Sequence, residues 1–229
     1  MSDPRTLSLT DYHGQAMANQ FWTADQAVGR LAVLLPGLDY SSDMPLLFFT
    51  RRMLLWRGMD VLNLNPVTRS AAFQGASAVE QLAWLTADVL AGIEAGLAQG
   101  DYRGLILAGK SIGSLAIAGA VEQAQSLLPT ALVWLTPLLK WDVVLKAALS
   151  ARGPQVYLCG DADSTFALER LRQILTAKPQ ASAYVAKDAN HSLEVPGNDR
   201  ATFQGFSEAM QFLGKFLDAA LAQVNENPA

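Results

Sequence analysis

Short runs of apolar residues recur along the chain, and the segments between them place apolar residues three or four positions apart. A run of about five apolar residues that ends at glycine, proline or polar residues is typical of a strand buried on both faces. Such runs predict six buried strands, at residues 31–35, 61–64, 104–108, 131–135, 155–159 and 183–185. Residues 7–23 alternate only loosely between apolar and polar, which predicts one or two strands at an edge of the sheet.

The segments between these runs have the period of amphipathic helices. They predict helices at residues 44–57, 76–99, 113–125, 143–151, 166–177 and 202–224. Strands that alternate with helices along a chain indicate an α/β fold, in which helices cover both faces of a mostly parallel, twisted sheet. The predicted architecture therefore has three layers.

The helix predicted at residues 44–57 shows which side chains we expect to be buried. Its apolar positions are expected to face the core, namely Leu46, Leu47, Met53, Leu54 and Trp56. Arg51 and Arg52 are expected to reach solvent. Further along, residues 65–75 are polar and contain a proline, which predicts a loop.

Length and composition favour one domain, residues 1–229, because α/β folds often reach this size as a single unit. Hydrophobic residues make up 51% of the chain and charged residues 17%, which supplies enough apolar surface for a large core. Only nineteen residues separate the strands predicted at 131–135 and 155–159. That is room for one crossover helix but not for an inserted domain, so we expect no substantial cap.

The net charge and the apolar pattern of the chain give no reason to expect binding to nucleic acid, association with a membrane or secretion. A net charge of −4 gives no electrostatic reason to expect binding to nucleic acid or to an anionic membrane. The sequence contains no run of 18 apolar residues, the length that a membrane-spanning helix needs. Residues 1–5 lack the basic and apolar regions of a signal peptide. These observations predict a cytoplasmic protein. The single cysteine, Cys159, ends an apolar run and is expected to be a buried core residue.

The sequence Gly109-Lys110-Ser111-Ile112-Gly113 stands between a predicted strand and a predicted helix. A G-x-S-x-G sequence in this position is typical of a nucleophile elbow, a sharp turn that holds the serine hydroxyl above the edge of a sheet. The Ile112 N–H, at the start of the helix, would point to the place where an oxyanion forms. A serine that only caps the helix is the alternative interpretation.

An activated serine requires a base, and the chain has two histidines, His13 and His191. His191 follows the last predicted strand, at the same edge of a parallel sheet as Ser111, whereas His13 precedes the first buried strand. A carboxylate is expected after the strand between Ser111 and His191. Asp163 is the first candidate and Asp161 the alternative, although either could instead cap the helix that follows.

The roles of these residues follow from their chemistry. Ser111 attacks a carbonyl carbon, His191 takes the serine proton and later gives it to the leaving group, and Asp163 fixes the imidazole. This chemistry needs neither a metal nor a cofactor.

A second oxyanion donor is expected from the Leu38 N–H, which follows a Pro-Gly pair at the end of an early strand. Walls of the substrate pocket are expected from Asp39, Tyr40 and Leu138. Lys110 lies next to the predicted nucleophile, where it either attracts an anionic substrate or points away into a surface contact.

The order of these motifs, over nearly the whole chain, resembles the α/β-hydrolase superfamily. The small size and the missing cap are similar to its dienelactone hydrolase and small carboxylesterase branch. The resemblance implies the α/β-hydrolase fold with an eight-stranded sheet, so two strands are expected before Leu31. Dienelactone hydrolases carry cysteine at the elbow, where this chain has Ser111, and the Pro-Gly loop lacks the His-Gly-Gly-Gly run of many lipases.

Together these features predict a serine hydrolase that cleaves a small carboxylic ester or thioester through an acyl-enzyme intermediate. Its partner would be a small-molecule ester or acyl substrate, and without a lid the site would suit short acyl groups. Two alternatives stay open. One is an acyltransferase or amidase that uses the same three residues, and the other is a hydrolase-fold protein that binds or regulates. The oligomeric state is left open.

Overall fold

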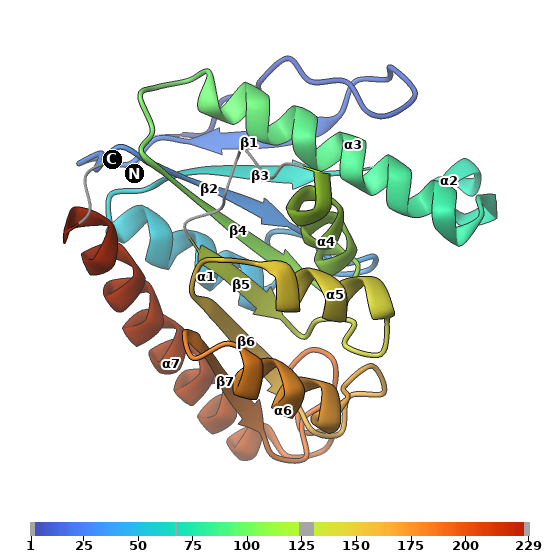
Figure 1. The fold of residues 1–229 in the computed structure, drawn as a ribbon, viewed down its shortest axis with the longest axis vertical. Coiled ribbons are helices and arrows are strands. Elements are labelled where there is room, and N and C mark those ends of the chain that lie inside the picture. The colour runs from blue at the N-terminus through green and yellow to red at the C-terminus, as the bar shows by residue number, and fades with distance from the viewer. Residues whose placement is uncertain (1–2, 67, 124–130, 227–229) are drawn as a thin grey trace.

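The computed structural model describes residues 3–66, 68–123 and 131–226, which form a seven-stranded sheet between two layers of helices (Figure 1). The strands are β1 (Ala18–Trp22), β2 (Arg30–Leu35), β3 (Asp60–Asn65), β4 (Gly104–Lys110), β5 (Ala131–Leu135), β6 (Gln155–Gly160) and β7 (Ala181–Ala186). Their order in the sheet is β1-β3-β2-β4-β5-β6-β7. β1 pairs antiparallel with β3 and the other pairs are parallel. All six predicted buried strands are present, although β7 is only half-buried.

The helices of the described residues are α1 (Pro45–Trp56), α2 (Ala71–Gly75), α3 (Ala78–Leu97), α4 (Gly113–Gln123), α5 (Asp142–Ser150), α6 (Leu168–Ala177) and α7 (Asp199–Glu226). α3 to α6 cover one face of the sheet, and α1 and α7 cover the other (Figure 1). Alternate residues of the central strand β4 enter the two layers. Leu105 and Leu107 pack with α3 to α6, whereas Ile106 and Ala108 pack with α1 and α7. The predicted three layers are therefore present.

The expectation of eight strands, two of them before Leu31, was wrong: the described residues form one strand there, β1. Arg5 and Phe21 exchange backbone hydrogen bonds of 3.0 and 2.7 Å at the outer edge of β1. Beyond that point the Asn19 side chain forms hydrogen bonds with both backbone groups of Leu7. Its Oδ1 accepts from the Leu7 N–H and its Nδ2 donates to the Leu7 carbonyl, each at 2.9 Å. These bonds replace the ladder that an eighth strand would need.

Two side chains of α1 lie opposite to the expectation. Arg51 is buried, with its guanidinium 4.9 Å from the centroid of the Trp22 ring and 3.3 Å from Asp43 Oδ1. A guanidinium that stacks on a ring and pairs with a carboxylate can leave water at modest cost. Trp56 is instead 63% exposed, and the half-buried Arg52 lies 4.9 Å over its ring.

Residues 65–75, predicted as a loop, contain the short helix α2. Its N-cap is Ser70, whose Oγ accepts from the Phe73 N–H at 3.1 Å, and Phe73 is buried. Ser77 caps α3 in the same way, through the Glu80 N–H at 3.2 Å. The Ser70 cap therefore starts a short helix inside the segment that was predicted to be a loop.

The connection between β5 and β6 holds one helix, α5, so no cap is inserted there. Within the described ranges no helix combines the length and the apolar character that crossing a bilayer requires. The predicted end of the helix at residues 113–125 lies outside the described residues.

Candidate active site

Three of the predicted site residues lie at the carboxyl ends of parallel strands. Ser111 follows β4, Asp163 follows β6 and His191 follows β7, and β5 separates β4 from β6 in the sheet. Functional groups collect at this edge in open parallel sheets. His13 lies elsewhere, exposed, with its ring centroid 4.3 Å from that of Trp84 on α3.

Ser111 has a φ of 55°, in the left-handed region that strains residues other than glycine. Its N–H donates to the Leu135 carbonyl at 3.1 Å, and its carbonyl accepts from Ser114 Oγ at 2.6 Å. A Cβ on Gly109 would lie 2.6 Å from the Gly113 carbonyl oxygen, so strand and helix can approach this closely only with glycine there. This backbone geometry is the one that a nucleophile elbow requires.

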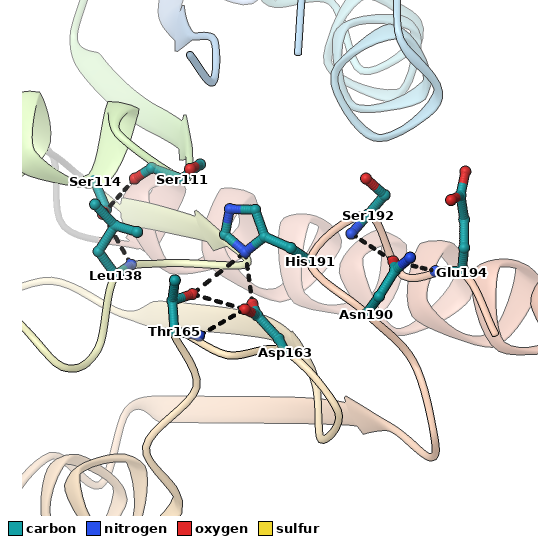
Figure 2. A network of polar contacts seen from close by, with 9 residues as sticks. All are labelled: Ser111, Ser114, Leu138, Asp163, Thr165, Asn190, His191, Ser192 and Glu194. Atoms are coloured by element: carbon teal, nitrogen blue, oxygen red, sulfur yellow. Dashed lines mark hydrogen bonds and ion pairs between the residues drawn. The ribbon is translucent and has the colours of Figure 1, made fainter. Parts of the chain in front are cut away.

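His191 and Asp163 form a short link in the polar network of Figure 2, with His191 Nδ1 2.6 Å from Asp163 Oδ2. A carboxylate oxygen accepts, so Nδ1 carries the proton and Nε2 is left as the acceptor. Nε2 faces the side on which Ser111 lies (Figure 2). Thr165 completes the network: its N–H and its Oγ donate to Asp163 Oδ1 at 2.8 and 2.9 Å.

The two members of this pair differ in exposure. The Asp163 side chain is 2% exposed and that of His191 is 32% exposed. Burial raises the pKa of Asp163. The hydrogen bonds from His191 and Thr165, together with the charge on His191, lower it by a larger amount, so the pKa of Asp163 lies below its ordinary value. Asp163 therefore remains a carboxylate that can stabilise an imidazolium.

Asp161, the alternative acid, is directed to a different group. Its Oδ1 accepts from the Asp188 N–H at 2.5 Å, in the turn that follows β7, where Asp188 has a φ of 57°. Asp161 thus stabilises the turn that leads to His191, and the geometry favours Asp163 as the partner of the imidazole.

The loop that carries His191 is held by close backbone packing. Asn190 Oδ1 accepts from the Ser192 N–H at 2.8 Å and from the Glu194 N–H at 3.1 Å. A Cβ on Gly160, the last residue of β6, would lie 2.2 Å from the Ala189 carbonyl oxygen. Glycine at the end of β6 therefore lets the loop pack directly on the strand.

Thr165 and Asn190 are supporting residues that the sequence analysis missed. Both belong to short turns in which an Asp or Asn side chain accepts from the backbone two residues further on. The spacings Asp163-x-Thr165 and Asn190-x-Ser192 were the available signal, because this is the pattern of an Asx turn.

The two predicted oxyanion donors come from the residue directly after Ser111 and from the loop after β2. Within the described residues, neither the Ile112 N–H nor the Leu38 N–H has a hydrogen-bond acceptor. A Cβ on Gly37 would lie 3.4 Å from the Ser111 Cβ, which places the loop after β2 beside the serine. The Gly37 N–H donates to the Tyr40 carbonyl at 3.0 Å and closes this loop into a tight turn.

The predicted pocket residues each have another contact. Asp39 pairs with Arg69 at 2.8 Å, with both side chains exposed. Tyr40 is buried, and its hydroxyl accepts from the Leu46 N–H at 2.9 Å. Leu138 is buried, and its N–H donates to Ser114 Oγ at 3.1 Å. Their role as pocket walls stays a prediction.

Lys110 makes no surface contact, because only 2% of it is exposed, and its Nζ lies 4.7 Å from the centroid of the Tyr40 ring. Burial lowers the pKa of Lys110 to about 8, against the opposing influence of Asp163. Cys159 is buried as predicted, and burial raises the pKa of its thiol. In the described part of the chain, no group of three or more His, Cys, Asp or Glu side chains is arranged to hold a metal ion.

No model of a protein family matches the sequence. No curated protein matches it either. Solved structures do match, over nearly the full length of each chain. A serine hydrolase without a lid from Xanthomonas campestris is 20% identical and covers 100% of this chain and 97% of its own, with a TM-score of 0.69.

An esterase from Pyrococcus furiosus is 16% identical, with 96% and 91% of the two chains covered and a TM-score of 0.70. A cold-adapted esterase from an Arctic intertidal metagenomic library is 18% identical, with 94% and 99% covered and a TM-score of 0.68. At these identities the likeness concerns the fold. This chain has the fold of the α/β hydrolases.

Proposed function

We propose that the protein is a serine hydrolase that cleaves a small carboxylic ester or thioester through an acyl-enzyme intermediate. The observation that carries this proposal is the 2.6 Å bond between His191 and the buried Asp163, at the same sheet edge as the strained Ser111. A serine that only caps a helix needs neither a positive φ nor an oriented imidazole. The likeness to esterases supports the proposal.

In the proposed reaction His191 Nε2 takes the proton of Ser111 Oγ as that oxygen attacks the carbonyl carbon. The imidazolium then gives the proton to the leaving alcohol or thiol, and an acyl-enzyme remains. Water attacks the acyl-enzyme with His191 again acting as base, which releases the carboxylic acid and restores the serine. Asp163 holds the ring in the required tautomer and stabilises its positive charge.

The negative charge that develops on the substrate oxygen needs donors that are already in place. We assign this role to the Ile112 N–H, which directly follows Ser111, and to the Leu38 N–H, whose neighbour Gly37 lies beside Ser111. Neither N–H has an acceptor within the described residues. Loss of one such donor costs about 3–4 kcal/mol in the transition state.

On this proposal residues 1–229 form one catalytic domain without a lid, since α5 alone joins β5 to β6. An uncovered site offers little apolar surface to a long acyl chain, so short acyl groups are the expected substrates. We expect p-nitrophenyl acetate and butyrate to be hydrolysed faster than p-nitrophenyl palmitate, and the opposite order would contradict this expectation.

The experiment that tests the proposal is labelling with a fluorescent fluorophosphonate, read by in-gel fluorescence and intact mass. We expect one adduct on the wild-type protein and none on Ser111→Ala or His191→Ala. The exposed Ser207→Ala and His13→Ala are matched controls that should label like the wild type. A folded wild-type protein that does not react would refute the proposal and favour a binding or regulatory protein.

The identity of the acid is tested by a second pair of variants. Asp163→Asn removes the acceptor that sets the tautomer of His191 and should lower kcat about 10⁴-fold. Asp161→Asn changes a residue bonded to Asp188, and its kcat should stay within a few-fold of the wild type. Product analysis with added alcohol or amine distinguishes hydrolysis from acyl transfer.

A further inference from the structure

Lys110 is a buried cation for which the proposed mechanism has no use. It is the last residue of β4, directly before Ser111, and its side chain lies on the face of the sheet that α1 and α7 cover, as do Ile106 and Ala108. A buried ammonium normally has a carboxylate beside it. No ion pair joins Lys110 to a carboxylate of the residues that the structure describes.

The Lys110 side chain instead runs beneath the loop that presents Leu38. A Cβ on Gly37 would lie 3.0 Å from Lys110 Cδ and 2.9 Å from Tyr40 Cβ, so the methylene stem passes directly under the glycine. The Nζ lies 4.7 Å from the centroid of the Tyr40 ring, the distance of a cation–π contact.

Tyr40 fixes the far end of this loop. Its carbonyl accepts from the Gly37 N–H at 3.0 Å, and its hydroxyl accepts from the Leu46 N–H in the first turn of α1 at 2.9 Å. The ring is therefore tied to the helix by its hydroxyl and to Lys110 by its face. The Leu38 N–H lies within the turn that these contacts close.

We propose that Lys110 is a positioning residue: its ammonium group, held on the Tyr40 ring, keeps the turn from Gly37 to Tyr40 in the shape that directs the Leu38 N–H to the oxyanion. This inference rests on the proposed hydrolase function. Only the charged form of the lysine is attracted to the face of a ring, so the turn is held by the ammonium and released by the neutral amine.

The inference predicts a fall in activity on the alkaline side. The groups that act on this lysine are Tyr40, from the loop after β2, and Asp163, from the loop after β6, whose negative charge favours the ammonium. Burial, and to a lesser extent the charge of Glu194 from the loop after β7, raise the pKa of Tyr40 against the opposing hydrogen bond from the Leu46 N–H. Burial lowers the pKa of Lys110 to about 8, so the ammonium is present at pH 7 and is lost above pH 8.

The test measures kcat and KM for p-nitrophenyl acetate, corrected for uncatalysed hydrolysis, between pH 6.5 and 9.5. Wild-type kcat should fall above about pH 8. Lys110→Met, which keeps the stem and removes the charge, should lower kcat at pH 7 about tenfold with KM within about twofold, and should lose the alkaline fall. Lys110→Arg should keep the activity and move the fall to higher pH, and the exposed Lys146→Met should match the wild type.

A second variant tests whether Lys110 acts through the ring. Tyr40→Leu removes the ring face, and the double variant with Lys110→Met should be no slower than the slower single variant. Multiplied effects would overturn the inference, and so would a wild-type kcat that is flat from pH 7 to 9.5, a result that needs no variant to fold. Wild-type protein that fails to label with fluorophosphonate would instead refute the hydrolase proposal, so the two failures are distinguishable.

Discussion

The hydroxyl of Thr165 offers a sharp test of how the site keeps Asp163 ionised. Asp163 Oδ1 accepts from the Thr165 N–H at 2.8 Å and from Thr165 Oγ at 2.9 Å, while Oδ2 is bonded to His191 Nδ1 at 2.6 Å. Thr165→Val has nearly the same shape and keeps the N–H bond. It removes one of the three donors to a carboxylate that water scarcely reaches.

A hydrogen bond to a charged group contributes about 1.5–3 kcal/mol. Because the Thr165 N–H still donates to Asp163 Oδ1 in the variant, we expect the loss of stability to lie at the lower end, about 1.5 kcal/mol. The sign with pH follows from the lowered pKa of Asp163. A carboxyl with a lowered pKa stabilises the fold above its unfolded pKa of about 3.9, and this contribution is lost as the pH falls through the folded value. Thr165→Val should therefore lower the free energy of unfolding most at pH 7, and the deficit should shrink as the pH falls below about 3.9.

Urea denaturation at pH 7 and at pH 3 measures this difference, and p-nitrophenyl acetate hydrolysis measures the effect on catalysis. We expect kcat to fall about tenfold, because the same 1.5 kcal/mol supports the carboxylate that faces the imidazolium. Thr165→Ser keeps the hydroxyl and is the matched control. A Thr165→Val protein with the urea midpoint and the kcat of Thr165→Ser would show that the hydroxyl does not support Asp163.

Two further predictions concern stability. A Cβ on Gly119 would lie 1.8 Å from Thr86 Oγ, between α3 and α4, so Gly119→Ala should lower the free energy of unfolding in urea by about 1–3 kcal/mol. A Cβ on Gly205 would have its nearest contact at 3.8 Å, so Gly205→Ala should raise the free energy of unfolding by about 0.5–1 kcal/mol. Burial raises the pKa of Asp88 to about 6, so the contribution of this carboxyl to stability falls as the pH rises from about 4 to 6. Asp88→Asn keeps the acceptor for the Tyr12 N–H and should be more stable than the wild type in urea at pH 7 but not at pH 4.

The buried strands were predictable because their side chains enter apolar layers on both faces, which leaves an uninterrupted apolar run in the sequence. The N-terminal edge was not. The Asn19 side chain forms the hydrogen bonds that the backbone of another strand would form. The sequence pattern around this asparagine does not indicate that its side chain replaces a strand in this way. The burial of Arg51 was not predicted for a related reason: it depends on the ring of Trp22, which belongs to β1, a distant part of the chain.

In the candidate site, too, some residues could be predicted from the order of the strands, whereas others depended on contacts that only the structure shows. Ser111 and His191 could be proposed from the sequence because each follows a recognisable strand, and in a parallel sheet all such loops meet at one edge. The choice between Asp163 and Asp161 depended on side-chain direction, which the structure supplies through two different hydrogen bonds. For Lys110 the direction was available from the sequence. Side chains alternate along a strand, so a lysine two residues after Ala108 must share its apolar face, and a charge placed there needs a partner from a neighbouring loop.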